Sequence, residues 1–357
     1  MPCFAIETPQ RNYSATVERG ILERVREFVP NKAGMVFVVS TEDVWKHQGA
    51  NLERGLAGLP HETLFLPGGE ENKRLAPLET LAERMVELGA DRSSLVIAFG
   101  GGIVNDMAGF LAAMFMRGIP VLQIPTTLLA QVDAAIGGKT GVNLVSGKNL
   151  IGSFHQPVAA LIDPDTLSTL PEREYRAGLF EVIKCGIIRS VNLFWLMADY
   201  WEAVIARHSG TVDEMVAECV RIKAEVVTAD EREGDLRRIL NYGHTIGHAL
   251  EAETGYTRFL HGEAVAFGML AVTRLAENLG ILASSEARQM EETIGKYGPI
   301  PTLEGIAAEN LLARLSRDKK AVQGKVHFVL AEKVGQVRVV SGVDESLILA
   351  SIREALR

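Results

Sequence analysis

The first half of the chain alternates short β-branched runs with helical patterns, and this alternation limits the fold more than any other feature. Four runs have the apolar, β-branched character of buried strands, at residues 35–39, 63–66, 95–99 and 121–124. Helical patterns lie between them at residues 78–88 and 105–116. Strands that alternate with helices predict an α/β fold with a parallel, doubly wound sheet.

The second half changes character after Pro171. Long helical patterns dominate it, at residues 174–188, 212–229, 245–253, 263–279 and 284–296. Two late β-branched runs, 326–330 and 337–340, are typical of a hairpin. We therefore expect two domains, an α/β domain over residues 1–171 and a mainly α-helical domain over residues 172–357.

Composition excludes some classes of function. The net charge of −8 gives no electrostatic support for nucleic-acid binding. The three cysteines, Cys3, Cys185 and Cys219, are few and widely spaced, which favours a reducing compartment and predicts a cytoplasmic protein. Residues 1–10 lack the pattern of a signal peptide, and Arg117 and Pro120 interrupt the apolar stretch after Gly109, so no membrane role is expected.

Three histidines within eighteen positions indicate a metal site. His244 and His248 are four residues apart and share a helix face, and His261 follows. Imidazole is a common zinc ligand and also moves protons near neutral pH. A metal held by two histidines still needs a third ligand, for which Glu181 is a candidate. An ion pair between Glu181 and Lys184, three residues on, is the alternative interpretation of that carboxylate.

Glycines at the end of a predicted strand indicate a phosphate site. Residues 100–102 are all glycine, follow the run at 95–99 and open a helix. Such a turn lets the backbone approach a phosphate, which the helix N-terminus also favours. The spacing is not that of the G-x-G-x-x-G fingerprint, so a structural turn remains an alternative. Thr126 and Thr127 follow the next strand, and their hydroxyl groups either contact a ligand or cap a helix.

Cationic and amide side chains suggest an anionic ligand. Lys139 and Lys148 lie in two glycine-rich segments that we expect to be loops, and they indicate a phosphate site, with solvated surface lysines as the alternative. Arg237 lies four residues before Asn241, which in turn lies three residues before His244. If that segment is helical, the three form one polar stripe able to bind an oxygen-rich anion beside the metal.

Taken together, the motifs make the chain similar to the 3-dehydroquinate synthase family of sugar-phosphate cyclases over about residues 67–330. The segments that carry this resemblance occur in the family's order, at residues 100–106, 125–133, 137–140, 147–149, 181–184, 241–248, 261–263 and 317–320. Two positions depart from it: Asn105 replaces the glycine usual before Asp106, and Thr41 stands near a usual aspartate.

The resemblance implies an N-terminal NAD-binding domain and a C-terminal metal-binding domain. It implies zinc, or cobalt in its place, held by Glu181, His244 and His261, with His248 as a proton relay rather than a ligand. The catalytic groups that it implies are His248, Lys184, Asp133 and Glu233. The NAD contacts that it implies are Glu70, Lys73, Gly100, Gly101, Gly102, Asp106, Thr126, Thr127, Lys148 and Thr169.

The resemblance also implies how a phosphorylated sugar acid binds. Lys223 and Arg237 would hold its carboxylate. The groups at its phosphate end would be Lys139, Asn149, Asn241 and one of Lys319 or Lys320. It further implies a homodimer in which Arg117 reaches the phosphate in the neighbouring subunit's site.

The activity implied is conversion of 3-deoxy-D-arabino-heptulosonate 7-phosphate to 3-dehydroquinate and phosphate. The steps are transient oxidation by NAD, phosphate elimination, re-reduction, ring opening and aldol closure, with no net redox change. One alternative is another sugar-phosphate cyclase, whose substrate lacks the carboxylate. A metal-dependent polyol or glycerol-phosphate dehydrogenase would instead accumulate NADH, and a non-catalytic nucleotide-binding sensor would release no phosphate.

Overall fold

The chain divides into two compact units. The computed structural model describes residues 2–321 and 326–357, and for residues 316–321 it describes the helix without the side chains. One unit comprises Met1–Pro171 with Val216–Arg232, and the other comprises Glu172–Met215 with Glu233–Arg357. The domain boundary between residues 171 and 172 remains a prediction. The sequence did not indicate that residues 216–232, which follow this boundary in the chain, belong to the first unit.

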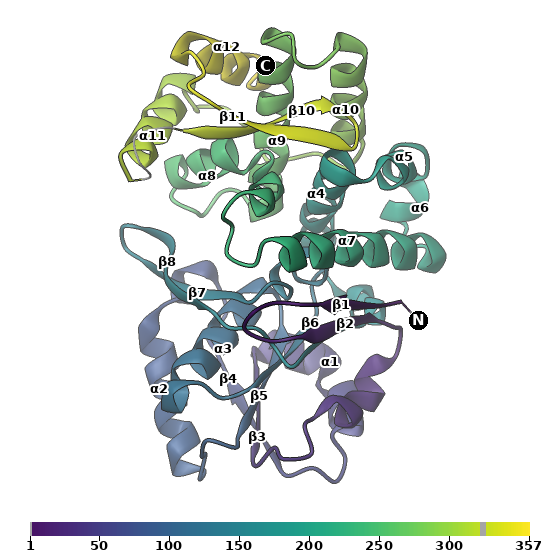
Figure 1. The fold of residues 1–357 in the computed structure, drawn as a ribbon, viewed down its shortest axis with the longest axis vertical. Helices are drawn as coiled ribbons and strands as arrows, with labels where there is room; N and C mark the ends of the chain where they lie inside the picture. The colour runs from purple at the N-terminus through teal and green to yellow at the C-terminus, as the bar shows by residue number, and fades with distance from the viewer. Residues whose placement is uncertain (1, 322–325) are drawn as a thin grey trace. The chain divides into compact units, whose positions relative to one another are not determined.

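The first unit is built on a seven-stranded sheet with the order β1-β2-β9-β6-β5-β3-β4 (Figure 1). The strands are β1 (Cys3–Ile6), β2 (Tyr13–Val17), β3 (Val36–Ser40), β4 (His61–Phe65), β5 (Leu95–Gly100), β6 (Val121–Pro125) and β9 (Ala159–Ile162). All neighbours pair in parallel except β1 and β2. The four predicted strands correspond to β3, β4, β5 and β6, so the predicted parallel sheet is confirmed.

Helical segments cover both faces of this sheet, which is why its central strands are apolar throughout. The segments are η1 (Ile21–Phe28), α1 (Glu42–Gly55), α2 (Leu75–Glu87) and α3 (Gly102–Met114). Phe37 and Val39 of β3 pack in the apolar cluster of α2 and α3. Val36 and Val38 point to the opposite face and pack in the cluster of η1 and α1. A strand buried on both faces needs a continuous apolar run, as the sequence has.

The order of the strands places a ligand edge beside β5. The chain passes from β3 outward to β4 and then returns to β5 on the other side of β3. Ligands of doubly wound sheets bind at the carboxyl ends of the strands where the order reverses in this way. Gly100 ends β5 at this position, and Gly101 leads directly into α3.

A separate hairpin, β7 (Lys139–Leu144) with β8 (Gly147–Phe154), lies in the chain between β6 and β9. We expected loops around Lys139 and Lys148, and this expectation was wrong. Gly141 and Gly152 face each other across the two strands. A Cβ on Gly152 would lie 2.1 Å from the carbonyl oxygen of Thr140, so these glycines allow close strand pairing rather than a loop. Four shorter segments complete the unit: η2 (Glu70–Asn72), η3 (Phe115–Arg117), η4 (Ala130–Ala134) and η5 (Pro164–Thr169).

The second unit is mainly helical (Figure 1). Its elements are α4 (Glu172–Arg189), α5 (Val191–Asp199), α6 (Trp201–Ile205), η6 (Leu236–Asn241), α8 (His244–Glu253), α9 (His261–Asn278), α10 (Ser284–Lys296), α11 (Ala308–Ala321), β10 (His327–Lys333), β11 (Gln336–Ser341) and α12 (Glu345–Ala355). The remaining helix, α7 (Ser209–Ala229), belongs in part to each unit. Strands β10 and β11 pair as the predicted hairpin. Among the described residues, no helix combines the length and apolar character that crossing a membrane requires.

Two glycines let α9 pack directly on its neighbours. A Cβ on Gly262 would lie 1.9 Å from the carbonyl oxygen of Ala177 in α4. A Cβ on Gly268 would lie 1.9 Å from the carbonyl oxygen of Gly243, which immediately precedes α8. Both distances are far below van der Waals contact with backbone atoms, so only glycine permits the observed approach. Because α4, α8 and α9 carry Glu181, His244 and His261, this packing sets the separation of those side chains.

We predict that Gly268→Ala destabilises the protein by about 1–3 kcal/mol, since the added methyl must push α9 away from Gly243. Gly295→Ala is the matched control, because Gly295 is an exposed position of α10 with open space around its Cα. That change should be neutral or stabilise by up to about 1 kcal/mol. Urea denaturation of both variants measures the difference, and equal midpoints would show that the close approach does not constrain the helices.

Candidate functional site

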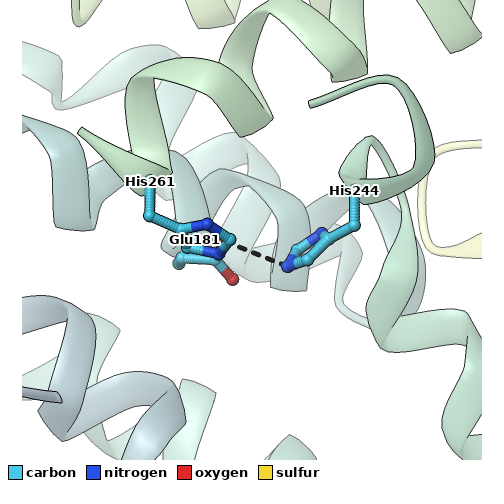
Figure 2. Close-up of side chains that lie close together, drawn as sticks. All are labelled: Glu181, His244 and His261. Carbon is cyan, nitrogen blue, oxygen red and sulfur yellow. Dashed lines mark ion pairs between the residues drawn. The ribbon is translucent and has the colours of Figure 1, made fainter. Parts of the chain in front are cut away.

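Glu181, His244 and His261 converge in the second unit, although they lie far apart in the sequence (Figure 2). Oε1 of Glu181 lies 3.6 Å from Nε2 of His244 and 3.9 Å from Nε2 of His261. One potential ligand atom from each residue lies within 4.8 Å of the others. The structure thus brings together the three residues that the family resemblance implies as metal ligands.

The two oxygens of Glu181 have different surroundings. Oε2 accepts a hydrogen bond from Nζ of Lys184, and both side chains are 1% exposed. Oε1 is also buried, yet it has no hydrogen-bond partner among the described residues. An unsatisfied buried carboxylate oxygen is costly. A cation between this oxygen and the two imidazoles would satisfy it, so the residues fit a metal ion.

His244 is held in the form that a metal needs. Its Nδ1–H donates to the carbonyl oxygen of Tyr242 at 3.1 Å, which directs the Nε2 lone pair toward Glu181. Burial lowers the pKa of His244 well below its ordinary value, and the nearby Lys184 ammonium lowers this pKa further. The imidazole is therefore neutral at physiological pH and able to donate its lone pair.

The sequence analysis missed Glu251, which orients the second imidazole. Nδ1 of His261 lies 3.4 Å from Oε2 of Glu251, a carboxylate that is 1% exposed. This contact favours a proton on Nδ1 and turns Nε2 toward Glu181. Glu251 lies three residues after His248 on α8, so helical spacing gave a signal, but only the fold shows that His261 meets it.

His248 is close to both other histidines without joining the Glu181 group. It is exposed, and its ring centroid lies 5.4 Å from that of His244 and 5.7 Å from that of His261. With Glu251 and His261 it forms a second arrangement that could hold a cation. The two arrangements share His261, so spacing of the histidines alone does not identify the ligands.

Four predicted NAD contacts form one network in the first unit. Nζ of Lys73 donates to Oδ2 of Asp106 at 2.5 Å. Nζ of Lys148 lies 3.6 Å from Oε1 of Glu70. Asn149, which we predicted at the substrate phosphate, joins this network because its Oδ1 accepts from Lys73 at 2.7 Å. Burial raises the pKa of Asp106, and the Lys73 ammonium opposes that shift.

The glycine turn is tightly packed. A Cβ on Gly101 would lie 3.0 Å from the methyl group of Thr127, and one on Gly100 would lie 2.7 Å from Val104. Oγ1 of Thr127 accepts from the backbone N–H of Ala130 at 3.3 Å, so it acts as a helix cap, whereas Thr126 is simply buried. Asn105 is 1% exposed and donates to the carbonyl oxygen of Ala98, so its amide is held inside the unit.

Other predicted residues of the first unit lie in different settings. Oγ1 of Thr169 accepts from Nε2 of Gln48 at 2.8 Å. Asp133 is ion-paired with Lys223. Lys139 is exposed at the start of β7. Arg117 is exposed at the end of η3.

The remaining predicted residues belong to the second unit. Nδ2 of Asn241 donates to Oε1 of Glu233 at 2.6 Å, so the structure brings this predicted pair together. Arg237 is 1% exposed in η6. The segment is not one continuous helix, because Gly243 has a φ of 77° and separates η6 from α8, so the condition for a single polar stripe is not met. Lys319 and Lys320 lie outside the side chains that the structure describes.

Comparisons with known families agree with this chemistry. The model of the 3-dehydroquinate synthase N-terminal region matches residues 63–177, and the model of the C-terminal region matches residues 178–321. A 3-dehydroquinate synthase of Solibacter usitatus (strain Ellin6076) is 66% identical over 356 residues, which is 100% of both chains.

Two solved structures share the fold over nearly the whole chain. A 2-deoxy-scyllo-inosose synthase, complexed with carbaglucose-6-phosphate, NAD+ and Co2+, is 27% identical with a TM-score of 0.89 and covers 99% of each chain. A 2-epi-5-epi-valiolone synthase of Streptomyces hygroscopicus subsp. jinggangensis 5008, with NAD+ and Zn2+ bound, is 27% identical with a TM-score of 0.90 and covers 98% of each chain.

We predict that Glu181→Gln and His244→Ala each weaken cobalt binding by more than about 100-fold, because each removes a direct ligand rather than an outer hydrogen-bonding partner. His248→Ala should keep its cobalt. Equilibrium dialysis with Co2+ measures the affinities, and circular dichroism confirms that each variant is folded. If His248→Ala loses cobalt while His244→Ala keeps it, the ligands are the His248–Glu251–His261 group instead.

Proposed function

The chain belongs to the 3-dehydroquinate synthase family, and from this premise we propose that it converts 3-deoxy-D-arabino-heptulosonate 7-phosphate to 3-dehydroquinate and inorganic phosphate. It is accordingly an enzyme, a phosphate-eliminating carbon–oxygen lyase. The observation that carries the proposal is the convergence of Glu181, His244 and His261 around an unsatisfied buried oxygen, in a chain that matches this family over both halves.

The second unit supplies the metal site. Glu181, His244 and His261 would hold zinc or cobalt, which provides a Lewis acid toward a substrate hydroxyl when bound. Lys184 holds the Glu181 carboxylate in place through the ion pair to Oε2. His248 is exposed beside the two ligand histidines, where it can exchange protons with substrate and solvent. Asn241 and Glu233 form a hydrogen-bonded pair available to substrate hydroxyl or phosphate groups.

The first unit would hold NAD, which supplies a reversible hydride acceptor when bound. The glycine turn at residues 100–102 and the start of α3 suit a pyrophosphate, because the glycines carry no side chain and the helix dipole favours negative charge. Lys73 and Asp106 provide a paired cation and carboxylate at the same edge. We retain residues 1–171 as the proposed NAD-binding domain.

Recognition of the substrate requires cations for its two anionic ends. Arg237 is almost fully buried, which is unusual for a guanidinium and suits a carboxylate ligand, and we assign Lys223 to the same group. We assign Lys139, Asn149, Asn241 and one of Lys319 or Lys320 to the phosphate. The bond from Lys73 to Oδ1 of Asn149 fixes that amide, so Nδ2 is the group that can donate to an anion.

We also propose a cytoplasmic homodimer in which Arg117 serves the neighbouring subunit's phosphate site. Met116, Arg117 and Gly118 have positive φ angles of 47°, 69° and 116°. Positive φ is strained for the two residues that carry a Cβ, and such strain is often associated with functional positions. The turn presents Arg117 as an exposed cation, as expected of a residue that reaches another subunit.

The proposed activity predicts one phosphate released per substrate consumed, without accumulation of NADH. The purified protein is incubated with NAD+, Co2+ and the heptulosonate phosphate while phosphate and absorbance at the NADH wavelength are followed. The carbocyclic product is identified by mass spectrometry and NMR. Glu181→Gln serves as the control and should release almost no phosphate, because it lacks the ligand charge that balances a dication.

Each alternative gives a different result in this assay. A polyol or glycerol-phosphate dehydrogenase would accumulate NADH. A different cyclase would turn over a sugar phosphate without a carboxylate in preference to the heptulosonate, and a nucleotide-binding sensor would turn over neither. Any of these outcomes would contradict the proposed function.

The homodimer predicts complementation between two inactive variants. Arg117→Ala and Lys139→Ala homodimers should each be nearly inactive. In a mixed dimer one site carries both defects and the other carries neither. Random exchange makes about half of the dimers mixed, so activity should recover to roughly a quarter of wild type. Mass spectrometry confirms the exchange, and no recovery after it would mean that Arg117 does not act across a subunit boundary.

A further inference from the structure

Asn143 is a buried polar residue to which the sequence analysis gave no role. It lies near the end of β7 and is 5% exposed. The pairing of β7 with β8 shifts register between Val142 and Leu144, so Asn143 is the residue at an irregularity of the hairpin. Irregularities of this kind redirect a side chain away from the regular ladder.

Asn143 makes five hydrogen bonds with other segments, two of them from Nδ2 to Glu70, and the one to the backbone carbonyl oxygen of Glu70 is 3.5 Å long. Its backbone N–H donates to the carbonyl oxygen of Lys73 at 2.8 Å. Its own carbonyl oxygen accepts from Nη1 of Arg74 at 3.3 Å. Its side-chain Nδ2 donates to Oε1 of Glu70 at 2.7 Å, and Oδ1 accepts from the backbone N–H of Asn149 at 2.8 Å. Every polar group of this residue therefore joins it to another segment.

These bonds connect the segment of Glu70 and Lys73 with β8, which carries Lys148, a predicted NAD contact, and Asn149, a proposed contact of the substrate phosphate. Glu70 and Lys73 belong to the segment proposed to contact NAD. Asn149 also has a φ of 53°, a left-handed conformation that a residue with a Cβ adopts at a cost, and the bond to Asn143 holds its backbone there. Direct bonds from Lys73 to Asn149 and to Asp106 complete the network.

We propose that Asn143 is a positioning residue that couples the dinucleotide segment to the substrate-phosphate segment. The proposal rests on the proposed function for the identity of the two ligands. The Nδ2 of Asn143 holds Glu70, and its Oδ1 holds the backbone of Asn149. A ligand that orders one of these two segments therefore also restricts the motion of the other. Binding of one ligand thereby removes part of the ordering cost of the second.

Only an amide meets both requirements at this position. Glu70 needs a donor and the N–H of Asn149 needs an acceptor, and an amide side chain provides one of each. Asn143→Ala removes both partners. Asn143→Asp hardly changes the size of the side chain and keeps the acceptor. It nevertheless places a second carboxylate against Glu70, and the repulsion should displace the segment of Glu70.

The first measurement needs no ligand. In hydrogen–deuterium exchange of the unliganded protein, Asn143→Ala should raise exchange in residues 69–75 and 147–152 together, by about tenfold, because both lose the same buried partner. The control is Asn12→Ala in the β1–β2 turn of the same unit, where Oδ1 accepts a single bond from Thr8 N–H. It should leave both segments unchanged. A rise confined to residues 147–152, or no rise, would overturn the proposal.

The second measurement separates coupling from simple loss of structure. Calorimetry gives the NAD+ dissociation constant with and without saturating inorganic phosphate. In wild type, phosphate should tighten NAD+ binding about fivefold or more, and in Asn143→Ala the ratio should fall close to one. A merely structural role would weaken both constants and keep their ratio. An unchanged ratio, or no coupling in wild type, would contradict the proposal.

A rescue experiment tests the direction of the hydrogen bond. Asn143→Asp should weaken NAD+ binding by at least about tenfold. In the double variant, Gln at position 70 supplies an amide donor to the new carboxylate. The double variant should therefore bind NAD+ almost as tightly as the Glu70→Gln single variant does. Additive losses would overturn the assigned contact. Failure of wild type to release phosphate from the heptulosonate would contradict the proposed function alone, and the exchange result would still decide whether Asn143 couples the two segments.

Discussion

A buried carboxylate with one satisfied and one unsatisfied oxygen is the interaction on which the second unit depends. Burying Glu181 is tolerable because Lys184 neutralises one side of it. The other oxygen faces two imidazoles at 3.6 and 3.9 Å, which is an arrangement suited to sharing a cation rather than a hydrogen bond. Gly262 and Gly268 make this geometry possible, since they let α9 approach α4 and the start of α8.

In the function proposed for it, the first unit has to hold anions beside a sheet edge without losing stability. Its cations are not isolated: Lys73 is paired with Asp106, and Lys148 lies near Glu70. Pairs of this kind keep charges in fixed positions while their combined field stays moderate. Asn143 connects Glu70 with Asn149 of the β7–β8 hairpin, and Lys73 bonds to Asn149 directly.

Sequence patterns predicted the elements better than the contacts between them. The apolar runs at β3 and β5 identified a sheet buried on both faces, and the family resemblance implied Glu181, His244 and His261 together, which the structure brings close. Helical spacing alone pointed to His248 instead, because it carries no information about a distant glutamate on α4. The β7–β8 hairpin was mistaken for loops, since its glycines serve close strand pairing. Glu251 and Asn143 were missed because their partners are brought to them only by the fold.

The most direct test of this account is anomalous diffraction from crystals of the cobalt-loaded protein. We predict a single cobalt peak in the second unit, at about 2.0–2.2 Å from an oxygen of Glu181 and from Nε2 of His244 and His261. No bond to His248 is expected. A peak bonded to His248 and Glu251, or a second unit without a cobalt peak after loading, would contradict the account.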